Sequence, residues 1–310
     1  MELVRGLHNL RAEHRGCAVT IGNFDGVHLG HRATLDRLRG HARQVGLPAT
    51  VLTFEPTPRE FLSPARAPAR LTRLREKLVL LNREHVDRCV VLHFNSQLQH
   101  MRGQEFVTGL LRQRLDARRV VVGHDFRFGF RGEADVEMLR TAAGTHAFEV
   151  DVVEPLTLAG ERVSSSAVRE ALATGDLEHA ARLLGRRYSM HGRVMEGDHL
   201  GQRLGFPTAN IRLHRRVAPL GGIFAVRVLG VGDQPLPGVA SLGTRPTVNG
   251  TEPLLEAHVF DFHGDLYRRH LEIEFVAKLR EERKFASLEA MVMEMHEDAR
   301  RAREVLRVVS

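Results

Sequence analysis

The sequence predicts an α/β domain with a parallel sheet over residues 1–185 and an antiparallel β domain with a C-terminal helix over residues 186–310. In the first part, short apolar runs alternate with amphipathic stretches, which is typical of a parallel sheet with helices on both faces. In the second part, short candidate strands follow one another with Gly and Pro between them, which favours an antiparallel barrel or sandwich. A chain of 310 residues is long enough for two domains, each with its own core.

The individual elements follow from these patterns in chain order. Apolar runs predict strands at 18–22, 49–54, 88–94, 119–123 and 148–153, and the stretches between them predict helices at 31–46, 71–85 and 103–115. A serine-rich segment with helical spacing, 164–185, closes the first domain. In the second domain the pattern predicts strands at 188–197, 222–230, 235–243, 254–262 and 270–279, and a final helix at 287–306.

The composition indicates an intracellular protein with anionic partners. The formal charge is +7 and is almost all arginine, since the only lysines are Lys77, Lys278 and Lys284. No GxxxxGK[ST] motif is present, so phosphate chemistry would depend on His, Arg, backbone amides and metal. No apolar run is long enough to cross a bilayer, and the two cysteines lie far apart. We therefore expect a cytoplasmic protein with no membrane partner.

The stretch TIGNFDGVHLGHRATL, residues 20–35, places His28 and His31 one helical turn apart directly after a predicted strand. Ligands of parallel sheets bind beyond the carboxyl ends of the strands, and a helix N-terminus presents free N–H groups that suit phosphate. Two imidazoles there can donate hydrogen bonds to phosphoryl oxygens, and Gly30 would let a nucleotide lie close to the backbone. Two surface histidines that happen to start a helix would explain HxxH alone, and a zinc site would need a third ligand.

The whole string GNFDGVHLGH, residues 22–31, resembles the HxGH signature of nucleotidyltransferases in the form used by bacterial bifunctional riboflavin kinase/FMN adenylyltransferases. Further stretches fit that family in the same order: TFEPTPREFL, GHDFRFG, VSSSAVREAL, GFPTAN, GVASLGTRPTVNG and LEAHVFDFHGDLY…LREERKF. The resemblance runs nearly from end to end. It implies a Rossmann-like nucleotidyltransferase domain followed by an antiparallel β-barrel riboflavin kinase domain with a C-terminal helix.

For the first domain, the resemblance implies transfer of AMP from ATP to FMN with release of pyrophosphate. His28 and His31 would be the catalytic phosphate-binding pair. The other ATP-binding residues would be Gly22, Asn23, Phe24, Gly30, Ser164, Ser165 and Arg169. The flavin-binding residues would be Pro56, Pro58, Asp125 and Arg127. The serines alone would be explained by a plain helix N-cap, and FEPTP by any proline-rich end of a strand.

For the second domain, the resemblance implies phosphorylation of the terminal hydroxyl of riboflavin by ATP. Thr208 and Asn210 would hold Mg²⁺, and Glu256 would be the catalytic base. A flap, residues 201–208, would cover the phosphates and contribute Gly205 and Pro207. Arg280 and Phe285 would bind flavin. From the residues alone, Glu256 would be an outward-facing strand carboxylate, and Arg280 and Phe285 would simply start the last helix.

The chain departs from the usual family pattern at several positions near these sites: Thr57, His124, Gly132, Ser166, Gln202 and Ser241. One alternative is therefore that one domain is inactive, and another is that the HxGH domain uses a different phosphate acceptor. A nucleic-acid-binding protein is disfavoured, because the chain has no tryptophan and two tyrosines for base stacking. We expect small-molecule substrates (ATP, riboflavin and FMN), no nucleic-acid partner, and a monomer or weak homo-oligomer.

Overall fold

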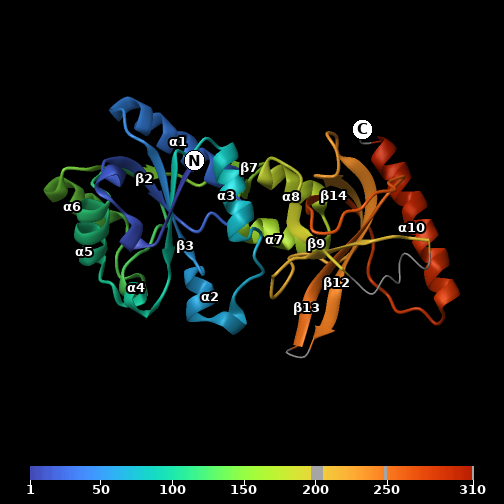
Figure 1. The fold of residues 1–310 in the computed structure, drawn as a ribbon. Helices are drawn as coiled ribbons and strands as arrows, with labels where there is room; N and C mark the ends of the chain where they lie inside the picture. The colour runs from blue at the N-terminus through green and yellow to red at the C-terminus, as the bar shows by residue number, and fades with distance from the viewer. Residues whose placement is uncertain (197–204, 248–249, 309–310) are drawn as a thin grey trace. The chain divides into compact units, whose positions relative to one another are not determined.

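The computed structural model describes residues 1–196, 205–247 and 250–308 (Figure 1). The chain forms two compact units. The first unit consists of Met1–Pro68 and Lys77–Val163, and the second consists of Ala69–Glu76 and Ser164–Ser310. Half of the predicted flap, residues 201–204 with Gln202, lies outside the described residues.

The first unit contains the predicted parallel sheet. Its strand order is β1-β4-β3-β2-β5-β6, and every pair is parallel. The strands are β1 (Glu2–Arg5), β2 (Cys17–Ile21), β3 (Ala49–Glu55), β4 (Arg88–His93), β5 (Ala117–Gly123) and β6 (Glu149–Val153). The sequence pattern does not predict β1, because only Val4 of this edge strand is buried. A two-stranded hairpin follows, formed by β7 (Thr157–Leu158) and β8 (Glu161–Arg162).

Helices cover this sheet and close its core. The longer ones are α1 (Leu29–Val45), α3 (Leu74–Arg83), α6 (Val136–His146) and a π-helix, η4 (Phe106–Arg114). The shorter ones are α2 (Pro58–Leu62), α4 (Ser96–His100), α5 (Gly103–Glu105) and the 3₁₀ turns η1 (Leu7–Asn9), η2 (Ala12–His14), η3 (Pro64–Arg66) and η5 (Phe130–Gly132). The predicted helix at 103–115 is thus one α-helical turn followed by the π-helix. The sequence pattern does not predict α6, whose Leu139 is fully buried against the sheet.

The second unit contains a closed antiparallel barrel, so the choice between barrel and sandwich is settled. The strand order is β10-β13-β12-β11-β14-β9. The strands are β9 (Ser189–Met195), β10 (Ala209–Arg212), β11 (Gly222–Leu229), β12 (Leu236–Thr247), β13 (Gly250–Val259) and β14 (His270–Arg280). The predicted final helix is α10 (Leu288–Val308), which lies along the barrel (Figure 1). Helices α7 (Ser165–Thr174) and α8 (Leu177–Leu184) also belong to this unit.

A segment from early in the chain, Ala69–Glu76, is built into the second unit. Its Glu76 carboxylate accepts a hydrogen bond from Arg215 Nη2 at 2.6 Å, and the two side chains are 4% and 1% exposed. Tyr188 Oη donates to the carbonyl of Leu71 at 2.9 Å. The chain therefore passes between the units more than once, and Gly185 lies within the second unit, between α8 and β9.

Candidate active sites

The histidine pair lies where β2 leads into α1. His28 is the N-cap of α1, and its Nδ1 accepts the backbone N–H of His31 at 3.3 Å. The helix thus starts at Leu29, two residues earlier than predicted. The two imidazoles stack with centroids 3.7 Å apart, and the Phe24 ring lies 5.0 Å from His31. The local sequence therefore presents two parallel imidazoles at a helix N-terminus.

The loop before this helix has an unusual backbone. Phe24 and Val27 have φ values of 47° and 42°, in the left-handed region that β-branched and bulky residues rarely adopt. Both side chains are buried, so packing compensates for the strain. Such strain is concentrated at functional sites, and here it lies between the end of β2 and the histidines.

Two glycines of the motif make room for these rings. A Cβ on Gly30 would lie 3.1 Å from Cε1 of His28 and 3.3 Å from the carbonyl oxygen of Val163. A Cβ on Gly22 would lie 3.2 Å from the ring of Phe24. Gly30 was expected to let a nucleotide lie close to the backbone, and the structure shows that its missing Cβ makes room for the His28 ring.

A buried lysine that the sequence analysis did not connect with the motif lies behind the loop. Lys77, which is 1% exposed, donates from Nζ to Thr53 Oγ1 at 3.4 Å. The Thr53 hydroxyl in turn donates to the carbonyl of Asn23 at 3.4 Å. No spacing in the sequence signals this contact, because it joins three separate segments.

The serine stretch is the N-terminus of α7 in the second unit. Ser164 is its N-cap and accepts the N–H of Ala167 at 3.2 Å, so the plain capping role is present. Arg169 donates from Nε to the carbonyl of Ala69 at 2.7 Å. The structure therefore holds Arg169 against the segment Ala69–Glu76.

An apolar pocket of about 360 Å³ lies in the first unit. Five phenylalanines contribute to its wall: Phe54, Phe94, Phe106, Phe126 and Phe128. Of the residues expected to bind flavin, Pro58 and Arg127 line this pocket, and Pro56 and Asp125 do not. Asp125 instead pairs with Arg162 at 2.6 Å, and this hydrogen bond holds the pKa of the Asp125 carboxyl below its ordinary value.

Two of the family departures lie beside this pocket and have local roles. Thr57 is the N-cap of α2 and forms a capping box, in which the Glu60 carboxylate accepts the N–H of Thr57 at 2.9 Å. Gly132 has a φ of 69° and lines the pocket. A residue with a side chain would be strained at that position.

The second unit has a pocket of about 260 Å³ between the barrel wall and α10. One row of residues crosses five strands in register behind it: Asn210, Glu256, Ser241, Ile223 and Arg280. Directly opposed residues on neighbouring strands point to the same face. The alternate residues Leu255 and Ala257 are fully buried inside the barrel, so Glu256 faces outward into the pocket. The expectation of an outward-facing carboxylate is right about direction, but α10 covers that face.

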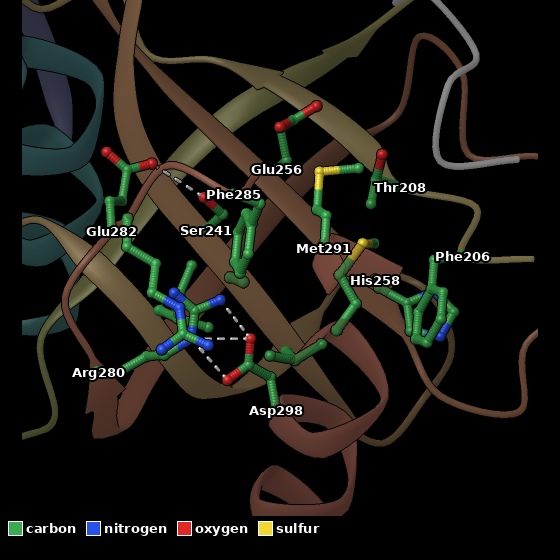
Figure 2. A pocket seen from close by; sticks show the side chains of 15 residues that line it. Phe206, Thr208, Ser241, Glu256, His258, Arg280, Glu282, Phe285, Met291 and Asp298 are labelled. Atoms are coloured by element: carbon green, nitrogen blue, oxygen red, sulfur yellow. Dashed lines mark hydrogen bonds and ion pairs between the residues drawn. The ribbon is translucent and has the colours of Figure 1, made fainter. Parts of the chain in front are cut away.

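Oxygen donors suited to magnesium lie at one end of this pocket. Figure 2 shows Glu256 and Thr208 there, and Arg280 with Asp298 at the other end. Asn210 lies opposite Glu256 in the β-ladder, although it does not line the pocket itself. Within the described ranges, no group of three or more His, Cys, Asp or Glu side chains could hold a metal. Hydroxyl, amide and a single carboxylate fit Mg²⁺ that keeps water and phosphate ligands.

Arg280 is fixed by a buried carboxylate. It ends β14, and its Nε and Nη2 bind Asp298 Oδ1 and Oδ2 at 2.9 and 2.7 Å. Asp298 is 3% exposed. The guanidinium lies 5.7 Å from the centroid of the Phe285 ring, and both residues line the pocket. The alternative that the two residues simply start the last helix is therefore wrong, because α10 begins at Leu288.

The sequence did not indicate a contact between two further residues that line this pocket. Ser241, noted only as a departure, donates to the Glu282 carboxylate at 3.3 Å, and Glu282 itself was not singled out. The carboxylate lies directly over Gly243, so a Cβ at that position would displace the end of the Glu282 side chain. This contact can be found only when the strand pairing around Ser241 is known.

Comparisons with known proteins agree with this two-unit architecture. Residues 10–167 match the family model of FAD synthetase, and residues 184–306 match that of riboflavin kinase. The bifunctional riboflavin kinase/FMN adenylyltransferase of Escherichia coli strain K12 is 46% identical over 305 residues, which cover 98% of this chain and 97% of that protein. The protein of the same name from Pseudomonas fluorescens is 48% identical over 304 residues, with the same coverage of 98% and 97%.

A solved structure is also similar over most of its length. It is titled a macrolide-efflux protein from Streptococcus pneumoniae, is 28% identical, and aligns with a TM-score of 0.80 over 96% of this chain and 97% of that one. In the described part of this chain, no helix is both long enough and apolar enough to span a membrane.

Proposed function

We propose which residues carry out each of two reactions in this chain, which belongs to the family of bifunctional riboflavin kinase/FMN adenylyltransferases. The second domain phosphorylates riboflavin to FMN, and the first domain adenylylates FMN to FAD. We place the boundary between the adenylyltransferase domain and the kinase domain at Gly185, because the riboflavin kinase match begins at residue 184.

For the kinase, Glu256 is the proposed base. Its carboxylate would accept the proton of the terminal riboflavin hydroxyl as that oxygen attacks the γ-phosphorus of ATP and ADP leaves. The supporting observation is the row across the barrel, which puts Glu256 in the pocket beside Thr208. Thr208 and Asn210 would hold Mg²⁺, which neutralises phosphate charge when bound. Gly205 and Pro207 would lie against the phosphates.

The flavin of the kinase would occupy the other end of the same pocket. Phe285, Met291 and Met295 offer an apolar wall for a planar ring system. Arg280 cannot swing freely, because Asp298 binds it through two oxygens. A flavin would therefore meet a guanidinium already held in place, which reduces the entropic cost of binding.

For the adenylyltransferase, the proposed phosphate site is the stacked pair His28 and His31 at the N-terminus of α1. A phosphate oxygen of FMN would attack the α-phosphorus of ATP, and pyrophosphate would leave. The imidazoles and the free backbone N–H groups of the helix would stabilise charge on the phosphoryl oxygens. Gly22, Asn23, Phe24 and Gly30 would line this site, and Ser164, Ser165 and Arg169 would form a second phosphate contact.

The FMN of this step would bind with its ring system in the phenylalanine-lined pocket. Aromatic side chains there offer area and stacking, and Pro58 and Arg127 belong to the same wall. Pro56 and Asp125 would act from outside the wall, Asp125 through its pair with Arg162. Both reactions are proposed to occur in the cytoplasm, in keeping with two buried free cysteines.

The test is to incubate the full chain with riboflavin, ATP and Mg²⁺ and to separate riboflavin, FMN and FAD over time. Glu256→Gln is expected to stop at riboflavin but to convert supplied FMN to FAD. His28→Ala/His31→Ala is expected to accumulate FMN. Matched controls are Glu252→Gln, an exposed carboxylate on the same strand, and His41→Ala on the same helix α1. FMN formation by Glu256→Gln at the unchanged rate would refute its role as base, and FMN as the sole product of the unaltered chain would mean an inactive first domain.

A further inference from the structure

The segment that leads to Thr208 lies outside the β-ladder. The pairing of β10 with β13 begins at Ala209, opposite Ala257. Pro207 comes two residues before Ala209 and has no N–H to donate, so ordinary strand pairing cannot continue through this proline. The carbonyl of Pro207 is instead bound by a side chain: Nδ1 of His258 lies 2.9 Å from it. Because a carbonyl oxygen only accepts, Nδ1 of His258 carries the proton.

The same imidazole also holds the residue before the proline. The ring of Phe206 meets the ring of His258 at 62° with centroids 5.2 Å apart (Figure 2). On its other side Phe206 contacts His296 of α10, with centroids 4.6 Å apart. Phe206 is buried, being 6% exposed. His258 thus contacts both residues that immediately precede Thr208.

One soft backbone angle of Pro207 sets the direction in which the chain enters Thr208. The ring of proline locks φ of Pro207, and the peptide bond to Thr208 is planar, so ψ of Pro207 is the remaining freedom. The direction of the Pro207 carbonyl is set by that same ψ. The hydrogen bond from His258 therefore fixes the backbone angle that precedes Thr208, and Thr208 lines the pocket together with Glu256.

We propose that His258 is a positioning residue of the kinase site, which sets Thr208 for MgATP by binding the carbonyl of Pro207. This inference rests on the proposed role of Thr208. Loss of one partly exposed hydrogen bond corresponds to about a threefold to tenfold change in an equilibrium constant. We expect that change in the KM of the kinase for MgATP, with a smaller effect on its kcat.

The experiment uses the full chain and two amide variants that differ in where the donor lies. In His258→Asn the amide nitrogen takes about the place of Nδ1, and in His258→Gln it takes about the place of Nε2. Kinase rates are measured against MgATP at saturating riboflavin, and the adenylyltransferase rate on supplied FMN is measured in the same preparations. His258→Gln is expected to raise the KM for MgATP threefold to tenfold, and His258→Asn is expected to restore it to within about twofold.

Two further variants separate this inference from simpler explanations. His296→Leu, which alters the other ring on Phe206, is expected to leave the KM for MgATP unchanged. Thr208→Ala should raise that KM at least as much as His258→Gln. If the KM for MgATP is raised in Thr208→Ala but unchanged in His258→Gln, the positioning role of His258 is overturned and the proposed role of Thr208 stands. An unchanged KM in Thr208→Ala would overturn the proposed role of Thr208 and this inference together, and equal effects of His258→Asn and His258→Gln would overturn the hydrogen bond as the cause.

Discussion

The buried ion pair between Glu76 and Arg215 makes the stability of the second unit sensitive to the loss of either partner. The Glu76 carboxylate accepts from Arg215 Nη2 at 2.6 Å and from the backbone N–H of His191 at 2.9 Å. Arg215 also donates to the carbonyl of Leu71 at 3.3 Å. Removing one partner of such a pair leaves an uncompensated buried charge, which costs about 3–5 kcal/mol. We therefore expect Arg215→Met to destabilise the second unit by about that amount.

Tyrosine fluorescence reports on this unit, because the chain has no tryptophan and both tyrosines, Tyr188 and Tyr267, lie in it. With a urea dependence of about 2 kcal/mol per molar, the midpoint should fall by about 1.5–2.5 M. The double variant Glu76→Gln/Arg215→Met should be more stable than Arg215→Met, because the amide still accepts the N–H of His191 and no charge is buried. Arg300→Met, in an exposed ion-pair cluster, should leave the midpoint unchanged. A shift below about 0.5 M in Arg215→Met would refute this reasoning.

Three further predictions concern the sites themselves. Gly30→Ala should displace the His28 ring and lower the FMN adenylyltransferase rate by about tenfold or more, while the kinase rate stays unchanged. An adenylyltransferase rate equal to that of the unaltered chain would contradict this packing role of Gly30. Asp298→Asn should raise the KM of the kinase for riboflavin by about tenfold, since Arg280 loses the carboxylate that binds it through two oxygens and keeps Glu294, 3.3 Å from its Nε. A calorimetric titration with riboflavin should show the same loss. The hydrogen bond from Arg162 holds the pKa of the Asp125 carboxyl below its ordinary value, so its contribution to stability is present above the ordinary pKa and is lost as the pH falls through the lowered pKa. In Arg162→Gln, an NMR titration should find the Asp125 pKa higher than in the unaltered chain, and an unchanged value would show that Arg162 is not the cause.

Local sequence was enough to predict several elements and the place of the histidine motif between a strand and a helix. Strands β2 to β5 each contain an apolar run, and a run of this kind has few alternatives to a buried strand. His28 and His31 are three positions apart, so their stacking depends on a cap and one helical turn. Most of the elements that the pattern missed are short or exposed: β1 buries only Val4, and β10 spans four residues after a proline. Helix α6 is the exception, because it has 11 residues and buries Val136, Leu139 and Ala142.

The row of residues behind the pocket of the second unit could not be read from residue spacing, because it is assembled by strand register. Asn210, Glu256, Ser241, Ile223 and Arg280 come from five strands, and a shift of one residue in any pairing would turn a side chain to the other face. The motif resemblance pointed to Asn210, Glu256 and Arg280 without showing that they share one row of the barrel. It did not point to His258 or Glu282, whose contacts are with the carbonyl of Pro207 and the hydroxyl of Ser241.

By itself, the sequence determined the two fold classes, the place of the histidine motif between a strand and a helix, and the family, because each depends on periodicity or on residues close together in the chain. Only the tertiary structure decided that Ala69–Glu76 belongs to the second unit, where Arg215, 139 positions beyond Glu76, binds it. No periodicity marks such a segment. The buried guanidinium of Arg215 requires a carboxylate partner, and Glu76 becomes that partner only when the whole chain has packed.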